Sequence, residues 1–137
     1  MKVSLRQQSA RRGASAVEFA IIAPIFFSVV FGLIEFSRMV MCYQVMTNAA
    51  REAAREGTLA GISTSDVIDR ANTVLQAGAV SGATASVQPA QVAVLEQGES
   101  FTVTVQGPYN AMGWLPVPQW LGGRMIGSSV TMKREGS

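Results

Sequence analysis

The stretch RRGASAVEFAIIAPIFFSVVFGLIEFSR, residues 11–38, decides the architecture of this chain. Its central run from Phe19 to Ile34 carries no charge and would form a helix of about 24 Å, slightly shorter than a bilayer core. With residues 14–17 included, the helix reaches about 21 residues and can span. The longer helix must then contain Glu18. Because an acidic side chain at mid-membrane costs roughly 2.5 to 3.5 kcal/mol, this carboxylate requires a partner.

The segment before the apolar run, residues 1–13, is polar and basic and predicts a cytoplasmic leader. By the positive-inside rule the N-terminus stays in the cytoplasm, and everything beyond the helix is exported. An ordinary secretory signal does not fit, because the apolar run exceeds the usual h-region of roughly 7 to 15 residues. We predict a transmembrane and rod helix over residues 14–57 and an exported α+β domain over residues 58–137. The leader charges are Lys2, Arg6, Arg11 and Arg12.

A single proteolytic cut after Gly13 would supply the partner that Glu18 lacks. The cut frees an α-amine on Ala14, which is mostly cationic at neutral pH because such amines titrate near pH 7.7 to 8.0. Ala14 and Glu18 are four residues apart and share one helix face. The amine can therefore pair with this carboxylate or with the equivalent one on a neighbouring copy. Pro24 removes a backbone hydrogen bond from the same helix and predicts a kink.

This arrangement resembles the type IV prepilin signal, in the variant of the tight-adherence (Flp/Tad) system. That variant has a glycine, four residues, then Glu and an aromatic residue; here these are Gly13, residues 14–17, Glu18 and Phe19, where the family usually has Tyr. The major Flp pilins stop shortly after the helix, whereas this chain continues. In its length and its alanine and arginine run at residues 49–56 it resembles TadE-like minor pilins or pseudopilins.

The resemblance implies a pilin-like fold and cleavage by a prepilin peptidase between Gly13 and Ala14, with Glu18 and Phe19 serving recognition and assembly. It implies work with a sister minor pilin, the major Flp pilin, an inner-membrane platform and an assembly ATPase. The implied location is a single pass in the inner membrane, with passage into the extracellular pilus. The implied role is assembly of Flp pili in adhesion and biofilm formation. The alternative is an uncut single-pass envelope protein whose exported domain is a binding module.

The composition argues against catalysis and cofactors. The chain has no histidine, the commonest general base and metal ligand, and its one cysteine, Cys42, cannot form an intramolecular disulfide. No glycine-rich phosphate loop precedes a helix. A net charge of +2 is too small for a nucleic-acid footprint. We expect a protein that is not an enzyme, holds no cofactor or metal, and binds no nucleic acid.

Helical periodicity continues beyond the apolar run and predicts one long helix that ends at Gly57 and Gly61. A second short helix is expected after a cap at Ser63, with acids in its first turn and an end at Gly78. The positions that share the inner face of the long helix are Met39, Cys42, Met46, Ala49, Ala50 and Ala53. The apolar stripe of the second helix is Val67, Ile68, Ala71, Val74 and Leu75.

From Ala79 onward, alternating residues predict a small antiparallel sheet of three to four strands, so the fold class is α+β. We expect a weak strand at residues 83–89, and stronger strands at 91–95 and 100–106 joined by a hairpin loop at 96–99. A last strand is expected at 126–133, with Val130 and Met132 facing inward.

The long connection GPYNAMGWLPVPQWLGGR, residues 107–124, is a candidate partner-contact loop. Two interpretations remain open. Its large apolar side chains cap the open end of the sheet, or they form an exposed patch that contacts a partner subunit or the outer leaflet of the membrane. The side chains concerned are Trp114, Leu115, Trp120 and Leu121.

Overall fold

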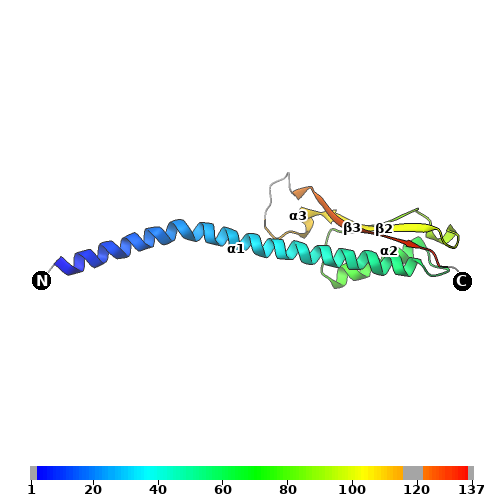
Figure 1. The fold of residues 1–137 in the computed structure, drawn as a ribbon, viewed down its shortest axis with the longest axis horizontal. Coiled ribbons are helices and arrows are strands. Elements are labelled where there is room, and N and C mark those ends of the chain that lie inside the picture. The colour runs from blue at the N-terminus through cyan, green and yellow to red at the C-terminus, as the bar shows by residue number, and fades with distance from the viewer. Residues whose placement is uncertain (1–2, 116–121, 136–137) are drawn as a thin grey trace. The chain divides into compact units, whose positions relative to one another are not determined.

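The computed structural model describes the backbone of residues 3–115 and 122–135, and the side chains of residues 13–115 and 122–135. The chain is α+β, as predicted, and it divides into two compact units, Met1–Phe36 and Ser37–Ser137. The elements follow in the order α1 (Val3–Gly57), α2 (Thr64–Ala77), β1 (Thr84–Gln88), the 3-10 helix η1 (Val92–Val94), β2 (Ser100–Pro108), α3 (Tyr109–Met112) and β3 (Met125–Lys133) (Figure 1).

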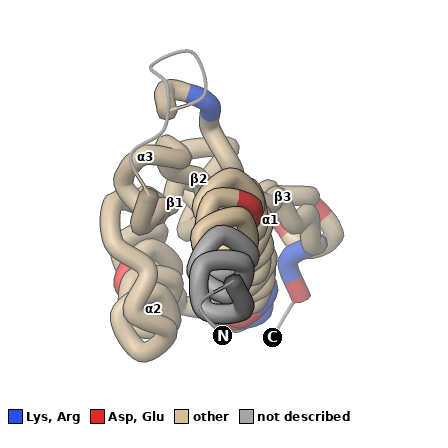
Figure 2. The backbone as a smooth tube through the Cα atoms, turned by 90° about the vertical axis from the view of Figure 1, so that its left-hand side faces the viewer, with Lys and Arg blue, Asp and Glu red and all other residues tan. Residues whose placement is uncertain are grey.

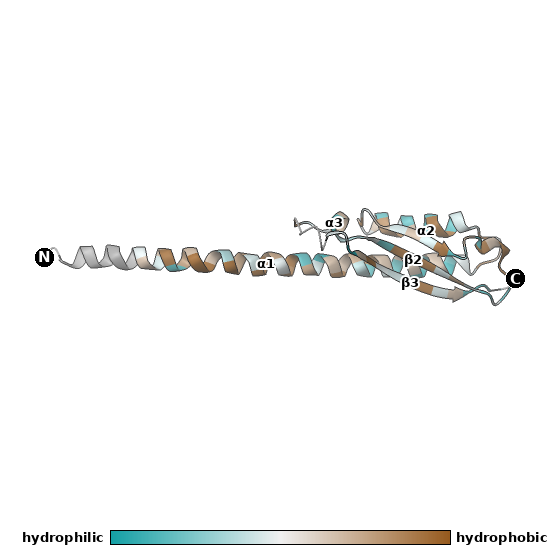
Figure 3. Ribbon diagram, turned by 90° about the horizontal axis from the view of Figure 1, so that it is seen from above, coloured by the Kyte–Doolittle hydropathy of each residue, from teal (hydrophilic) through white to brown (hydrophobic). Residues whose placement is uncertain are grey.

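The second unit packs the C-terminal part of α1 and α2 against one face of the sheet. Figures 2 and 3 place α2 and β3 on opposite sides of this part of α1. The predicted inner face of α1 is buried in full, because its alanines let the sheet approach closely. At Gly57 an added Cβ would lie 2.8 Å from the ring of Phe101 on β2. The buried core residues of α1 are Met39, Cys42, Met46, Ala49, Ala50, Ala53 and Ala54.

Helix α2 begins at the predicted cap. The Ser63 hydroxyl accepts a hydrogen bond from the Asp66 backbone N–H at 3.3 Å, and the Asp66 carboxylate accepts one from the Ser63 backbone N–H at 2.9 Å. The hydrogen bonds from the Ser63 side chain and backbone hold the pKa of the Asp66 carboxyl below its ordinary value. Val67, Ala71 and Leu75 are buried, so the predicted stripe faces the core.

The sheet has the order β1-β2-β3 with antiparallel pairing throughout. Strand β2 alternates as predicted, with Phe101, Val103 and Val105 buried against the helices. The opposite face is polar, and hydroxyl pairs join β2 to β3 across it: Thr102 with Thr131 at 2.8 Å and Thr104 with Ser129 at 2.9 Å. On β3, Val130 and Met132 pack partly buried against the core, as expected.

The predicted strand at residues 91–95 and its hairpin with 100–106 are wrong. Residues 92–94 form η1, and the weaker predicted strand supplies β1, which pairs with β2. Both sides of β2 are thus occupied by β1 and β3, so residues 91–95 cannot pair with β2 as the predicted hairpin requires. The backbone groups of Val92 bond outside the sheet: its N–H donates to the Thr64 hydroxyl at 3.0 Å, and its carbonyl accepts from the Arg134 guanidinium and from the Leu95 N–H. Gly98 still takes the expected positive φ, at +87°.

The long connection is partly ordered into the core, which the sequence did not predict. Strand β2 extends to Pro108, α3 follows directly, and Met112 is 1% exposed. The Arg38 side chain of α1 donates from Nε to the Met112 carbonyl oxygen at 2.8 Å. This bond fixes the start of the connection against the long helix.

Candidate functional site

The N-terminal part of α1 is the candidate anchor. Within the described residues, one helix, Gly13–Gly57, is long and apolar enough to cross a membrane, with a mean hydropathy of 2.4 in its most apolar window. That window buries none of its residues inside the protein, and large side chains such as Ile21 and Phe26 are more than half exposed. The hydrophobic stretch is visible along α1 in Figure 3. Apolar side chains at this density favour contact with lipid or with other helices, and the segment is compatible with a single-pass membrane anchor.

The predicted cleavage and recognition residues all lie in this part of α1. Gly13, Ala14, Glu18 and Phe19 are exposed and helical. Because Ala14 and Glu18 are one turn apart in a continuous helix, they lie on one face, as the spacing predicts. An added Cβ at Gly13 would meet nothing within 4 Å, so packing among the described atoms does not require this glycine. The structure leaves the cut itself untested.

A shallow apolar groove of about 320 Å³ follows directly after Glu18 along the helix. Its walls are aromatic: the rings of Phe26 and Phe27 meet edge to face with centroids 5.6 Å apart. A groove of this kind suits an apolar side chain from a lipid or a neighbouring helix and offers no polar group for catalysis. The lining residues are Phe19, Ile22, Ala23, Phe26 and Phe27.

Helix α1 continues without interruption through Pro24. The Ser28 hydroxyl donates to the Pro24 carbonyl oxygen at 2.7 Å, so a side chain adds a hydrogen bond beside the proline. The kink at Pro24 stays a prediction.

The candidate partner-contact loop is described only in part. Trp114 is 70% exposed, and Leu115 is half-buried. Trp120 and Leu121 lie outside the described residues, so both interpretations of the loop stay predictions. For Trp114 alone, the exposure favours an accessible side chain over a core position.

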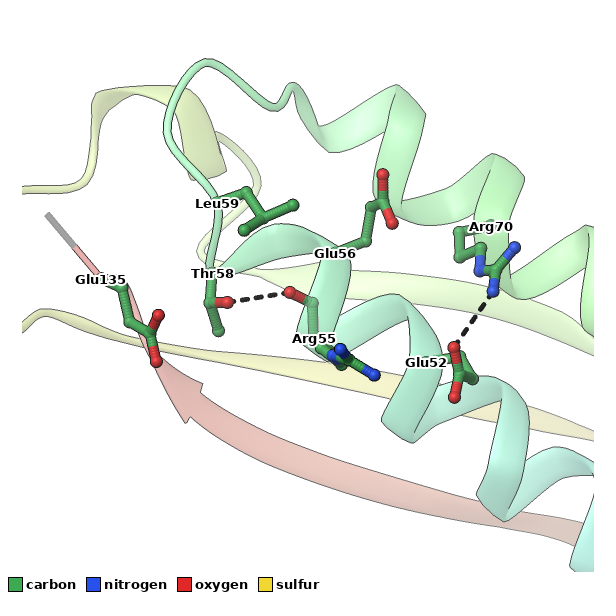
Figure 4. Close-up of a pocket in the computed structure, with 7 residues that line it drawn as sticks. All are labelled: Glu52, Arg55, Glu56, Thr58, Leu59, Arg70 and Glu135. Carbon is green, nitrogen blue, oxygen red and sulfur yellow. Dashed lines mark hydrogen bonds and ion pairs between the residues drawn. The ribbon is translucent and has the colours of Figure 1, made fainter. Parts of the chain in front are cut away.

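A polar pocket of about 480 Å³ lies where α1 ends, beside α2 and Glu135, the second residue after β3 (Figure 4). Glu52 of α1 forms an ion pair with Arg70 of α2 at 3.1 Å, with both side chains more than a third exposed. This pair joins two helices that local spacing could not relate, so the sequence analysis missed it. An exposed pair of this kind contributes little to stability. The lining residues are Glu52, Arg55, Glu56, Thr58, Leu59, Arg70 and Glu135.

The acidic side chains of the described residues are spread apart. Among the described residues no three His, Cys, Asp or Glu side chains lie close enough to hold a metal ion. Figure 2 shows β1 and β2 without charged residues, in agreement with their sequences. Cys42 is buried and forms no disulfide, and it packs as a small apolar side chain.

One segment of the chain matches a known protein family. Residues 13–55 match the family model described as TadE-like protein. The matched segment contains the Gly13 to Phe19 signal and all but the last residue of the alanine and arginine run at residues 49–56. Neither the curated proteins nor the solved structures gave a match. Over residues 13–55 the chain is therefore similar to TadE-like proteins, a likeness that points to the Tad pilus system.

Proposed function

We propose that this chain is a minor pilin or pseudopilin of the tight-adherence pilus, cut by a prepilin peptidase after Gly13. The observation that carries the proposal is the spacing of Gly13, Ala14 and Glu18 at the start of an apolar helix whose side chains find no partner surface within their own folding unit. Such a helix suits a membrane first and the interior of a helical fibre later. The protein acts as a structural subunit and not as an enzyme.

In this proposal the cut also creates the partner that Glu18 needs. The new amine of Ala14 lies one turn from the carboxylate, on the same face of α1. An ion pair inside an apolar assembly is favourable only when both charges are present, because a lone buried charge is strongly destabilising. Assembly therefore selects subunits that have been cut.

The helix also has to open locally for the cut, because α1 is continuous through residue 13. Glycine disfavours helix by about 1 kcal/mol relative to alanine, which lowers the cost of opening at that point. Since packing in the described structure does not require Gly13, recognition by the peptidase gives the glycine a purpose.

Coexpression with a prepilin peptidase tests the cut. We expect an intact mass that corresponds to a chain beginning at Ala14, and a Gly13→Leu variant that keeps residues 1–13. The control is Gly32→Leu, at a second helical glycine with open space around it, which should be cut normally. A wild-type mass that retains residues 1–13 would support the alternative, an uncut single-pass envelope protein with a binding module.

A second experiment tests the role of Glu18. The Glu18→Ala variant should be cut normally but should be absent from purified pili, because the Ala14 amine then enters the apolar assembly without a counter-charge. Glu52→Ala, which changes an exposed acid of the same helix, is the control and should be incorporated. Incorporation of Glu18→Ala at the wild-type level would contradict the proposed pairing. The same preparations show whether the pili support adhesion and biofilm formation.

A further inference from the structure

Strand β3 forms a long open edge of the sheet. The strand order ends at β3, and no other strand among residues 3–115 and 122–135 pairs with its outer side. The opposite edge is different, because β1 has only five residues, is followed by Pro89 and contacts α2. β3 has nine residues and contains neither proline nor a charge before Lys133. An unprotected edge of this kind is a template for pairing with another chain.

The hydrogen bonds at the two ends of β3 show which backbone groups face outward. The Tyr109 N–H donates to the Arg124 carbonyl oxygen, and the Arg134 N–H donates to the Glu99 carbonyl oxygen, both at 2.9 Å. Paired residues of an antiparallel ladder alternate between exchanging both hydrogen bonds and exchanging none. Even-numbered residues of β3 therefore bond to β2. Gly127, Ser129 and Thr131 direct their N–H and C=O groups away from β2, along the open edge.

The side chains on the core side of β3 are also incompletely covered. Ile126, Val130 and Met132 pack against the core but remain partly exposed. On the other face, the hydroxyls of Ser129 and Thr131 continue the pairs made with β2. An added strand would thus meet apolar side chains on one face and small polar ones on the other.

Charge restricts the partner further. Arg124 and Lys133 stand exposed just before and near the end of the strand, and the positions between them are uncharged. An extended segment with a neutral centre and acidic ends complements this edge. The direction in which it runs is immaterial to the charges, because both ends of the edge are cationic.

A second copy of β3 fits less well. β3 runs in the same direction as the adjacent C-terminal part of α1 (Figure 1). Antiparallel pairing of two β3 edges would therefore set these parts of α1 in opposite directions. The cationic end at Arg124 of each copy would also lie against the cationic end at Lys133 of the other, so like charges would meet at both ends of the paired strands.

We propose that the β3 edge binds an extended, acid-flanked segment of another protein chain as a fourth strand of the sheet. The main-chain bonds of Gly127, Ser129 and Thr131 hold the segment, and alternate apolar side chains cover Ile126, Val130 and Met132. This is β-strand addition, in which backbone bonds supply affinity and the alternating side chains supply specificity.

The test uses the full chain in detergent micelles and a synthetic peptide, Glu-Val-Thr-Val-Thr-Val-Thr-Val-Glu. Amide hydrogen exchange is measured with and without the peptide. We expect new protection of the amides of Gly127, Ser129 and Thr131, while those of Ser128 and Val130 are protected in both samples because they already bond to β2. Absence of binding, or binding that leaves the three outward amides unprotected, overturns the proposal. Protection that depends on protein concentration without peptide would show self-pairing and would overturn it as well.

Variants of Thr131 distinguish the contribution of the backbone N–H to peptide binding from that of the side chain. Thr131→Pro removes one outward N–H, which should weaken peptide binding about fivefold to tenfold. Thr131→Val loses the hydroxyl bond to Thr102 but keeps the N–H, and it should bind as the wild type does. Ala85→Pro changes the corresponding outward position of the β1 edge and should have no effect. Equal weakening by Thr131→Pro and Ala85→Pro would contradict the assignment to β3.

A peptide with lysine in place of both terminal glutamates tests the charge argument on the unmodified protein. It should bind about fivefold more weakly at low salt, with the difference reduced at high salt. Equal binding of the two peptides would contradict the acidic ends. The experiment needs neither a peptidase nor a pilus, so its failure is distinguishable from failure of the proposed cleavage.

Discussion

The two parts of α1 belong to one helix but are built for different surroundings. From residue 13 to 36, its large apolar side chains are exposed, and Gly32 has open space around it. From residue 37 to 57, the apolar face is made of Met, Cys and Ala, all buried against the sheet and α2. In one continuous helix, the first segment therefore needs lipid or other chains to cover its apolar surface. The second segment buries its apolar surface against other parts of the same chain.

The size of the side chains explains this difference. Alanines leave room for a sheet to approach the backbone, whereas Phe and Ile project too far and instead present surface to lipid or to neighbouring helices. The difference teaches that hydropathy alone does not tell where an apolar helix face is buried. The side-chain volumes along that face separate intrachain packing from packing with outside partners.

The largest expected effect on the free energy of unfolding comes from replacing one phenylalanine by alanine, and the comparison uses one ring beside each part of α1. Phe101, which packs on the C-terminal part of α1, is 1% exposed, whereas Phe27 is 50% exposed. Phe101→Ala should lower the free energy of unfolding by about 3 to 5 kcal/mol, and Phe27→Ala by less than about 0.5 kcal/mol.

Urea denaturation in micelles measures both variants. Tyrosine and tryptophan fluorescence is the signal, because every Tyr and Trp of the chain lies beyond residue 36. If Phe27→Ala destabilised the second unit as strongly as Phe101→Ala, the division of α1 into two environments would be wrong.

A smaller effect is expected at two glycines of α1. At Gly57 an added Cβ would lie 2.8 Å from the Phe101 ring, while at Gly32 nothing lies within 4 Å. Gly57→Ala should therefore cost about 1 to 3 kcal/mol through overpacking. Gly32→Ala should cost nothing, since alanine favours helix. The same denaturation experiment compares them, and a neutral Gly57→Ala would show that the ring moves aside freely.

Much of this fold follows from local pattern. The 3.6-residue period predicted Met46 and Ala53 on the buried face of α1, and the two-residue period predicted Phe101 and Val103 on the buried face of β2. The acids after Ser63 predicted the start of α2. Residues 91–95 alternate as a strand does, yet β2 was already paired on both sides. Only the tertiary structure shows that Val92 bonds to Thr64.

The candidate site, too, was predictable from local spacing only in part. The spacing of Ala14 and Glu18 predicts a shared helix face, and the structure has both residues in one continuous helix. The Arg38 bond to Met112 joins residues far apart in sequence, so no local pattern announces it. The groups that would pair with Glu18 in an assembly belong to other chains, or to an amine that exists only after a cut, and a single sequence contains neither.

The smallest effect concerns the cap of α2, which belongs wholly to the second unit. Hydrogen bonds from Ser63 lower the pKa of Asp66 in the folded state, so the cap stabilises the unit above the ordinary pKa of about 3.8 that the unfolded chain has. This contribution is lost as the pH falls through the lower, folded pKa. Asp66→Asn should therefore reduce the acid sensitivity of unfolding, whereas Asp69→Asn, three positions on in the same helix, should leave the capping contribution intact.

Ser63→Ala supplies the pH-independent counterpart. It removes the hydroxyl that accepts from the Asp66 N–H and should cost about 1 kcal/mol at neutral pH. Urea midpoints measured between pH 3 and pH 7 compare the variants. If the urea midpoint of Asp66→Asn fell with decreasing pH as steeply as that of the wild type, the carboxylate of the cap would not be a source of the acid sensitivity. Because the cap lies beyond residue 36, Phe27→Ala should show the same slope as the wild type, which makes this measurement a second check on the independence of the two parts of α1.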